Sequence, residues 1–483
     1  MTSRQHTVIA TVLVIIGLYV MRLTSAEIQP SPEGLIAVGG EHIVLFDEWK
    51  VSSTAPLTTW ASAVGVLVFG ATPLAARWFA IICVLVTLVI TYLVARRSLN
   101  FQNSILAIVV VGTSIPFITY GRQATDVVPF VACNMLAVWA VVKLRDTLSS
   151  STRLGVAALL VLGLAGSALS SPITAVLYGG SPVDSRGPLE VPLLLVEASP
   201  FLAGALLWCV VMTYRREYIP TWLQPDVLVL TVWFLAGLVI LAVVPTRSSL
   251  TVAYIIVPAT ILALRATEQF RESRRMGLII AFYGVVSMAS LWFVLSGLLH
   301  LPPTQMLLFL VAAAGCGVGL AGVLIMRSQK RRATMAVVLF RPVIFGAIGL
   351  AALGSVLVVM KGSPTVITGG RAVASALHED TLAVHSFTYL YHAQRDADAF
   401  NGQLAWYTNG WMTGWRPGYR YVLKAMPQNT VDEYVVRSVR GASWIVYYHP
   451  NVTADEQKLV RRLLIDQYSA HVETPHYTLY RNR

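Results

Sequence analysis

The chain has 483 residues, of which 56% are hydrophobic and only 12% are charged. Soluble domains carry about 25% charged residues, so this composition excludes an ordinary soluble protein. The net charge of +12 does not indicate a nucleic-acid partner, because most basic residues stand in short clusters between apolar segments, where they set the topology of a membrane protein.

Apolar segments recur from the N-terminus to about residue 360 and predict an all-α polytopic membrane domain. We predict about eleven transmembrane helices, each near the roughly 20 residues that cross a bilayer. Their approximate ranges are 7–25, 75–95, 104–120, 127–143, 154–172, 197–214, 225–245, 250–266, 276–297, 305–326 and 334–359. No small-residue cleavage site follows the first segment convincingly, which predicts an uncleaved signal-anchor. The cysteines all lie in these segments, where they are interpreted as small core residues: Cys83, Cys133, Cys209 and Cys316.

Basic residues are unequally divided between the two sides of these segments. With a cytoplasmic N-terminus, sixteen fall on the cytoplasmic side: Arg4, Arg96, Arg97, Lys143, Arg145, Arg153, Arg215, Arg216, Arg265, Arg271, Arg274, Arg275, Arg327, Lys330, Arg331 and Arg332. Before the polar C-terminal part, six fall on the other side: Arg22, Lys50, Arg77, Arg122, Arg186 and Arg247. This positive-inside bias predicts that the first loop, residues 26–74, and the C-terminal part are extracytoplasmic. The expected location of this multi-pass protein is a bacterial inner membrane.

Residues 56–70, inside the first loop, predict a helix that lies on the membrane surface. Trp60, Val64 and Leu67 fall on one face at helical spacing, and Pro56 suits a helix start. About 15 residues are short for a span and suitable for an interfacial helix. Counting this segment as a span would also reverse the side of every later basic cluster.

Residues 361–483 lack a spanning segment and predict a soluble α/β domain after a membrane domain at 1–360. The expected strands are 380–387, 442–449 and 476–482, and the expected amphipathic helix is 454–468. The aromatic run at 404–421 has two open interpretations, namely stacking on sugar rings or forming core and loop.

Asp47 and Glu48, with Lys50 close behind, stand in the first loop between the signal-anchor and the surface helix. The plain interpretation is a solvated acidic loop. The alternative is that the two membrane-associated helices hold these carboxylates at the bilayer surface. A carboxylate held there can act as a general base toward a substrate whose leaving group is a membrane lipid.

Two further positions lie at the outer ends of predicted spans. Asp126 follows Arg122 by four residues in "YGRQATD", which is either a surface ion pair or a pocket where Arg122 binds a phosphate and Asp126 orients an acceptor or a metal. Arg247 breaks the positive-inside trend and is either a headgroup-seeking side chain or a phosphate ligand, since a guanidinium matches phosphate geometry. No sequence spacing demands a metal.

The order of these features resembles the GT-C membrane glycosyltransferases that use polyprenyl-phosphate sugars. A signal-anchor precedes an Asp-Glu pair, a surface helix ending in "VFGATPLAARW", a span ending in "LVARR", the outer motif "YGRQATD", an outer arginine before "YIIVPATILAL", and an α/β tail. The chain is most similar to the protein O-mannosyltransferase and lipid A aminoarabinose transferase branch. The resemblance implies a GT-C fold, a polyprenyl-phosphate-linked sugar donor, and an acceptor glycan, lipid or protein.

By the same resemblance, Asp47 is the catalytic carboxylate, helped by Glu48, and Asp126 is the second acidic position of the outer site. Arg122 and Arg247 are expected near the lipid phosphate, with Lys50 a further candidate, and a divalent metal beside Asp47 and Asp126 stays open. The chain departs from the family where the surface helix begins, because "TAPL" replaces a His-Pro-Pro or Lys-Pro-Pro motif.

Other functions compete with a glycosyltransferase. A transporter or flippase for lipid-linked saccharides needs polar residues deep within its spans and often shows repeat symmetry. An O-antigen ligase or polymerase usually carries its long outer loop late in the chain, whereas this long loop comes first. A membrane-anchored glycan-binding protein needs no acids in the first loop.

Overall fold

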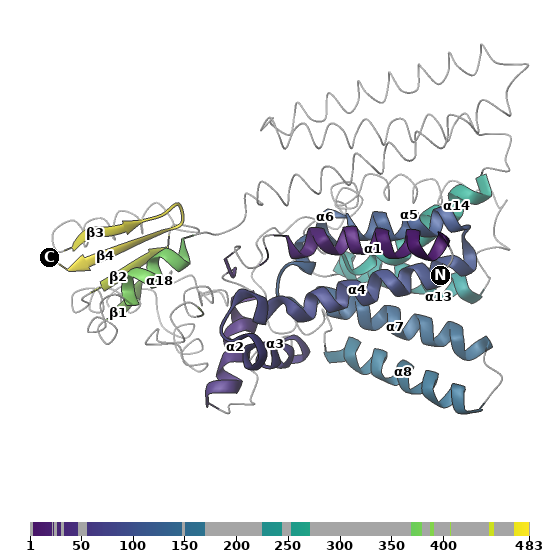
Figure 1. The fold of residues 1–483 in the computed structure, drawn as a ribbon, viewed down its shortest axis with the longest axis horizontal. Helices are drawn as coiled ribbons and strands as arrows, with labels where there is room; N and C mark the ends of the chain where they lie inside the picture. Colours follow the sequence, from purple (N-terminus) through teal and green to yellow (C-terminus); the bar gives the residue numbers. More distant parts are fainter. Residues whose placement is uncertain are drawn as a thin grey trace, which may run out of the picture.

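The computed structural model describes residues 3–21, 23, 27–29, 33–46, 56–146, 150–169, 225–243, 253–270, 369–378, 387–390, 406, 444–448 and 468–482. Apolar helices make up the N-terminal part, and a sheet with one helix makes up the described C-terminal part (Figure 1). The predicted boundary at residue 360 lies outside the described residues and stays a prediction.

Ten helices are described before residue 271. They are α1 (Ser3–Val20), α2 (Glu33–Phe46), α3 (Pro56–Phe69), α4 (Pro73–Ser98), α5 (Phe101–Gly112), α6 (Ile115–Gly121), α7 (Val127–Asp146), α8 (Ser150–Leu169), α13 (Pro225–Val243) and α14 (Ile256–Phe270). Among the described residues, two stretches are long and apolar enough to cross a membrane, namely all of α4 and Val127–Leu144 of α7. Four predicted spans lie outside the described residues: 197–214, 276–297, 305–326 and 334–359. The number of spans therefore stays a prediction.

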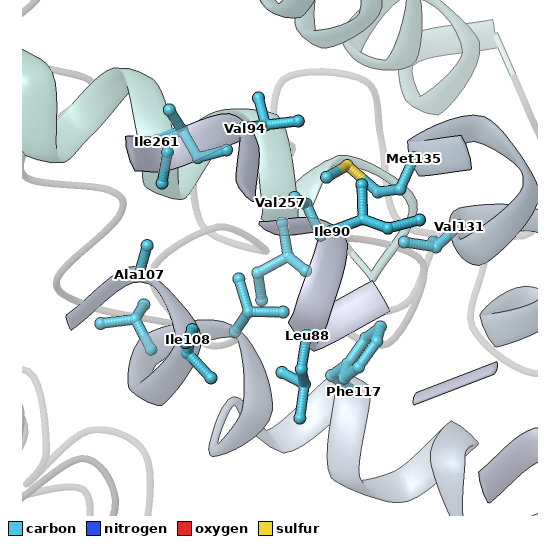
Figure 2. Close-up of a cluster of buried hydrophobic side chains, with 14 of the residues drawn as sticks. Leu88, Ile90, Val94, Ala107, Ile108, Phe117, Val131, Met135, Val257 and Ile261 are labelled. Carbon is cyan, nitrogen blue, oxygen red and sulfur yellow. The ribbon is translucent and has the colours of Figure 1, made fainter. Parts of the chain in front are cut away.

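Helix α4 is the centre of the helical part. Thr72 caps its N-terminus by accepting a hydrogen bond from the Ala75 amide, and Pro73 opens the first turn, where its missing N–H costs no hydrogen bond. Arg96 and Arg97 lie in the last turn, where positive charge complements the helix dipole. The apolar face of α4 packs into one core with side chains from α1, α5, α6, α7, α13 and α14. Figure 2 shows members of this core from α4, α5, α6, α7 and α14.

The predicted span 104–120 is wrong as a single helix, because the chain breaks between α5 and α6. Pro116 lies in the first turn of α6, and a proline there cannot donate the backbone hydrogen bond that would continue α5. The hydroxyl of Tyr19 donates to the Gly112 carbonyl at 2.8 Å, which satisfies one acceptor left at the end of α5. The sequence carried a signal for this break, because Gly112, Thr113 and Ser114 stand directly before Ile115–Pro116.

Helices α2 and α3 pack closely side by side within the first loop. A Cβ on Gly40 would lie 2.6 Å from the Ser62 Oγ, and one on Gly39 would lie 2.9 Å from a Thr59 methyl group. The polar side of α3 is therefore buried against α2, while Trp60 and Leu67 on its other side are exposed. This exposed apolar face suits lipid contact, as expected for the surface helix predicted at 56–70.

The described C-terminal elements are α18 (Gly370–His378) and the strands β1 (Phe387–Leu390), β2 (Trp444–Tyr448), β3 (Tyr468–Glu473) and β4 (Tyr477–Asn482). The sheet order is β1-β2-β4-β3, with β1 and β2 parallel and the other pairs antiparallel. We call α18 and this sheet the C-terminal unit. Strands β2 and β4 match two predicted strands, whereas β1 begins only where the strand predicted at 380–387 ends, and β3 was not predicted. The helix predicted at 454–468 lies outside the described residues except for Tyr468, which begins β3.

A second apolar cluster joins the first loop to the C-terminal unit. Its members are all buried: Ile28, Ile36, Ala37, Val38, Ala76, Ala124, Val373, Trp406, Trp444, Tyr477 and Leu479. Trp406 is 2% exposed, so this member of the aromatic run at 404–421 is a core residue rather than a surface for sugar stacking. The rest of that run lies outside the described residues.

The close packing of α2 on α3 makes a testable prediction. Gly40→Ala places a methyl group against Ser62 Oγ and the Ala63 amide, so we expect a loss of about 1–3 kcal/mol of unfolding free energy. Thermal unfolding of the purified protein in detergent measures this loss. Gly17→Ala in α1 is the matched control, because no atom lies within 4 Å of its added Cβ, and an equal effect of both substitutions would contradict the packing.

Candidate functional site

Four of the predicted site residues lie outside the described residues, namely Asp47, Glu48, Lys50 and Arg247. Asp47 follows the last residue of α2, Phe46, directly in the chain. The described residues that directly precede Asp47 and Glu48 in the chain are those of α2.

Asp126 ends the turn between α6 and α7, residues 122–126, which we call the α6–α7 turn. Its carbonyl accepts the Phe130 amide at 2.9 Å, so it stands at the start of α7. The residue is 8% exposed, and its Oδ2 has no hydrogen-bond partner. Burial raises the pKa of the carboxyl to about 6, against a smaller lowering by its own backbone hydrogen bond. Asp126 is thus a buried acid that can change its protonation state near neutral pH.

Arg122, at the other end of the same turn, donates from Nη2 to the Met21 carbonyl at 2.6 Å. The guanidinium that the sequence suggested for phosphate binding therefore also ties the α6–α7 turn to the end of α1. The side chain is half-exposed, so it keeps a surface that a ligand can reach.

Glu41 of α2 is a second buried acid, which the sequence analysis missed. It is 3% exposed, its Oε2 has no hydrogen-bond partner, and burial raises its pKa to about 7. The signal was present in the sequence, because Glu41 is an acid inside the apolar stretch "LIAVGGEHIVLF".

Buried polar atoms without partners gather on the elements that meet around these two acids. They are Glu41 Oε2 on α2, Ser62 Oγ on α3, and Thr125 Oγ1 and Asp126 Oδ2 in the α6–α7 turn. Gly40 packs on Ser62, and Thr58 of α3 donates to the Thr125 carbonyl at 3.5 Å, so the three elements contact one another. Buried polar groups in native proteins are nearly always paired, so such a group of atoms is typical of a place where water or a ligand binds.

The segment that follows Arg247 also reaches the α6–α7 turn. The ring of Tyr254 packs edge-on against Phe130 of α7, with 5.4 Å between centroids. Asp126 and Tyr120 are close enough to Tyr254 to act on it electrostatically. Arg247 itself is outside the described residues, and Tyr254, seven residues after it, packs on Phe130, four residues after Asp126.

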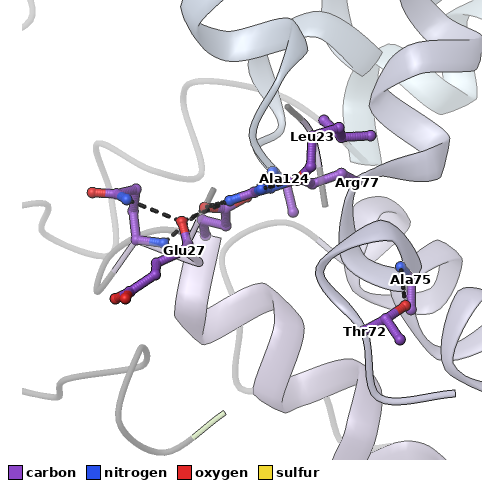
Figure 3. A network of polar contacts seen from close by, with 8 residues as sticks. Leu23, Glu27, Thr72, Ala75, Arg77 and Ala124 are labelled. Atoms are coloured by element: carbon purple, nitrogen blue, oxygen red, sulfur yellow. Dashed lines mark hydrogen bonds and ion pairs between the residues drawn. The ribbon is translucent and has the colours of Figure 1, made fainter. Parts of the chain in front are cut away.

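A buried ion pair between Glu33 of α2 and Arg77 of α4 holds these elements in place (Figure 3). Arg77 Nε donates to Glu33 Oε1 at 2.6 Å, and Nη2 donates to Oε2 at 3.0 Å. The exposed fractions are 2% and 0%. A two-point contact of this kind fixes orientation as well as distance.

Both partners of the pair also bind the backbone of surrounding segments. Arg77 donates to the carbonyls of Leu23 at 2.7 Å and Glu27 at 2.8 Å. Glu33 accepts the amides of Gln29 at 2.8 Å and Ala124 at 3.0 Å. Ala124 belongs to the α6–α7 turn, so the pair ties this turn to the first loop and to the start of α4.

In the sequence, Arg77 is one of the six basic residues expected on the side poor in them, and the structure adds a role for it there. A fully buried arginine in a two-point ion pair is a structural element of the site rather than a free charge outside the membrane. As with Arg247, an arginine on the side poor in basic residues was the available signal. Glu33 gave no such signal, because its partner lies 44 residues away in the chain.

Among the described residues, no three His, Cys, Asp or Glu side chains come together in a group that could hold a metal ion. Of the two acids considered for a metal, only Asp126 is described. The described polar atoms fit hydrogen bonding to a ligand, through two carboxyl groups and two hydroxyl groups.

The chain is similar to known proteins in sequence over one segment and in fold over nearly its whole length. The sequence model of the family described as dolichyl-phosphate-mannose-protein mannosyltransferase matches residues 53–178, which include α3, α4 and the α6–α7 turn. The crystal structure of ArnT from Cupriavidus metallidurans in the apo state superposes with a TM-score of 0.58 over 99% of this chain and 98% of that chain, at 13% identity. The chain has the GT-C fold.

A second ArnT structure supports the same GT-C fold. The crystal structure of ArnT from Cupriavidus metallidurans bound to undecaprenyl phosphate gives a TM-score of 0.56 at 15% identity, over 98% of each chain. No curated protein sequence matches the chain significantly. The GT-C resemblance inferred from the order of motifs is confirmed by these matches, which extend along nearly the whole chain.

The buried ion pair predicts a large effect on stability. Arg77→Met leaves the Glu33 carboxylate buried without its charged partner, so we expect a loss of about 3–5 kcal/mol of unfolding free energy. Thermal unfolding in detergent measures it. Arg153→Met, at an exposed position of α8, is the control and is expected to change stability by at most about 0.5 kcal/mol. Equal unfolding temperatures for the two variants would show that the pair is not buried.

The pKa of Asp126 predicts a pH-dependent stability. Because the folded-state pKa is raised from 3.8 to about 6, the wild type loses stability as pH rises through that window. Asp126→Asn removes this loss, so the stability of the variant relative to wild type should increase by about 2–3 kcal/mol between pH 4 and pH 7. Unfolding temperatures of both proteins across this range test the prediction. If the stability difference between wild type and Asp126→Asn does not change with pH, the Asp126 carboxyl is solvated and its pKa is not raised.

Proposed function

We propose that this chain is an inverting glycosyltransferase that moves a sugar from a polyprenyl-phosphate donor to an acceptor hydroxyl on the outer face of a bacterial inner membrane. The observation that carries the proposal is the set of buried polar atoms without partners on α2, α3 and the α6–α7 turn. Asp47 and Glu48 follow α2 directly in the chain, and the side of α3 opposite Ser62 is exposed and apolar.

Asp47 is the proposed general base, with Glu48 as its helper. It removes the proton from the acceptor hydroxyl, whose oxygen attacks the anomeric carbon of the donor sugar while the bond to the lipid phosphate breaks. One displacement inverts the anomeric centre and needs no covalent sugar–enzyme intermediate. The proton ends on the carboxylate, and the electron pair of the broken bond ends on the phosphate.

The charge that grows on the departing phosphate needs cationic partners. Arg122 is half-exposed at the α6–α7 turn, Arg247 stands seven residues before Tyr254, which packs on Phe130 of α7, and Lys50 follows Asp47 by three residues. The start of α3 offers no basic residue in "TAPL", so these three cations take over the phosphate contact that a His or Lys there makes in the family.

Asp126 is proposed to orient the sugar or the acceptor through hydrogen bonds. Its buried Oδ2 and the nearby Thr125 hydroxyl lack partners, so both can bind sugar hydroxyls without breaking an existing contact. A raised pKa lets the carboxyl either donate or accept near neutral pH.

The proposed donor, a polyprenyl-phosphate-linked sugar, is supported by the proteins that this chain resembles. One of the structures that this chain resembles is ArnT bound to undecaprenyl phosphate, and the family model is described by a dolichyl-phosphate-linked donor. Both lipids are polyprenyl phosphates, which supports this class for the present chain. The sugar is unassigned, and the acceptor is a cell-envelope glycan, a lipid or a protein.

A flippase for lipid-linked saccharides is the second candidate. The described spans favour the enzyme, because the charged residues of α4 and α7 stand near the helix ends: Arg77, Arg96, Arg97, Lys143, Arg145 and Asp146. Ionisable groups near the middle of a span typically mark a transport path, whereas the polar residues there, Thr87, Thr91 and Asn134, are uncharged.

The test of the proposed function compares wild type with Asp47→Asn in lipid, with radiolabelled polyprenyl-phosphate sugars and an envelope extract as acceptor. We expect transfer by wild type and a loss of about 10²–10⁴-fold in the variant, because the general base is gone while donor binding is kept. Glu473→Gln, at an exposed position of β3, is the matched control and should retain full transfer.

Two outcomes would contradict the proposal. Equal transfer by wild type and Asp47→Asn removes Asp47 from the chemistry. Movement of lipid-linked saccharide across the bilayer without any transfer to an acceptor supports the flippase instead.

A further inference from the structure

Glu27, in the first loop, binds two parts of the protein at once. Its carboxylate Oε2 accepts the backbone amides of Gly369 and Gly370 at 3.0 Å each, at the start of α18 in the C-terminal unit. Its backbone carbonyl accepts Arg77 Nη2 at 2.8 Å. A carboxylate at a helix N-terminus satisfies unpaired amides and is favoured by the helix dipole.

Of the two glycines that Glu27 binds, Gly369 does not tolerate a side chain. Gly369 has φ of +106°, which disfavours any residue with a side chain, and an added Cβ would collide with the Thr474 hydroxyl. Thr474 lies in the turn between β3 and β4, where its amide and hydroxyl bind Tyr477 at 2.8 and 3.0 Å. The contact made by Glu27 is therefore transmitted to the sheet.

On its other side, Glu27 is connected to the α6–α7 turn. Arg77 binds the Glu27 carbonyl and the Glu33 carboxylate, and Glu33 accepts the amide of Ala124, two residues before Asp126. Figure 3 shows Glu27, Arg77 and Ala124 in one continuous polar network. The neighbouring Ile28 is fully buried in the apolar cluster that joins the first loop to the C-terminal unit.

We propose that Glu27 is a positioning residue through which the C-terminal unit fixes the position of the first loop relative to the α6–α7 turn. The C-terminal unit is then part of the apparatus that places Asp47 and Asp126 relative to each other, rather than a tethered module that only binds acceptor. The catalytic consequence rests on the proposed function, whereas the mechanical coupling does not.

Backbone hydrogen exchange of the full-length protein in detergent tests the coupling directly. In Gly369→Ala, which distorts the start of α18, we expect faster exchange in peptides that cover 27–46 and 122–126, although the substitution lies in the C-terminal unit. In Glu27→Ala, we expect faster exchange of the Gly369 and Gly370 amides. Glu473→Ala, at an exposed carboxylate of β3, is the control and should leave both regions unchanged. Faster exchange confined to peptides of the C-terminal unit in Gly369→Ala would overturn the proposal.

Transfer kinetics test the positioning role. We expect Glu27→Ala to lower kcat about 10- to 100-fold with little change in the KM for donor, because misplacement of catalytic groups by about 1 Å has effects of this size. Glu27→Gln keeps an acceptor oxygen for both amides and should recover most of this loss. The Glu27→Ala/Gly369→Ala double variant should be no slower than the slower single variant, because both break the same contact.

The outcomes separate this inference from the proposed function. If wild type transfers no sugar, the proposed function fails, while hydrogen exchange still decides the coupling. If wild type transfers sugar and Glu27→Ala transfers equally well despite faster exchange at Gly369 and Gly370, docking of the C-terminal unit is irrelevant to catalysis and the positioning role is wrong. Additive losses in the double variant would also contradict it.

Discussion

The buried Glu33–Arg77 pair is the contact on which the rest of the outer site depends. Two charges at 0% and 2% exposure are held by two hydrogen bonds to each other and by four more to the backbone of Leu23, Glu27, Gln29 and Ala124. Desolvating such a pair is costly, and only a fully satisfied geometry offsets that cost. In return, one interaction fixes the end of the α1 region, the first loop, the start of α4 and the α6–α7 turn to one another.

The close approach of α2 and α3 explains how the hydroxyl groups of α3 and the Glu41 carboxyl are buried. Glycines on α2 let the polar face of α3 lie against it, which leaves the apolar face of α3 exposed. The result is a helix whose outside suits lipid and whose inside carries hydroxyl groups next to Glu41 and the α6–α7 turn. A lipid-linked substrate has the same division, with an apolar tail and a polar head, so the arrangement matches its chemistry.

Much of this organisation could be predicted from the sequence, because it depends on local signals. Hydropathy and basic clusters located most of the described apolar helices, Pro56 marked the start of α3, and "YGRQATD" located Asp126 at the start of α7. Helix α2, at Glu33–Phe46 in the first loop, was not predicted. The break between α5 and α6 was missed although Gly112, Thr113, Ser114 and Pro116 mark it in the sequence, because apolar residues on both sides add up to the length of one span. The Glu33–Arg77 pair and the contact of Glu27 with α18 depend on partners distant in the chain, which only the folded structure brings together. Strand β3 was missed although its partner β4 is the next strand along the chain. Asp47, Glu48, Lys50 and Arg247 lie outside the described residues, so their places in the site stay predictions.

The central claim is that the head group of a polyprenyl-phosphate donor binds where α2, α3 and the α6–α7 turn meet. The most direct measurement is photo-crosslinking of the purified protein with a polyprenyl phosphate that carries a diazirine next to the phosphate, followed by mass spectrometry of the labelled peptides. The account predicts that label concentrates in peptides covering 33–62 and 122–130, and that excess undecaprenyl phosphate removes it. Label concentrated instead on the exposed apolar face of α8, Ser150–Leu169, with no label at the junction, would contradict the account.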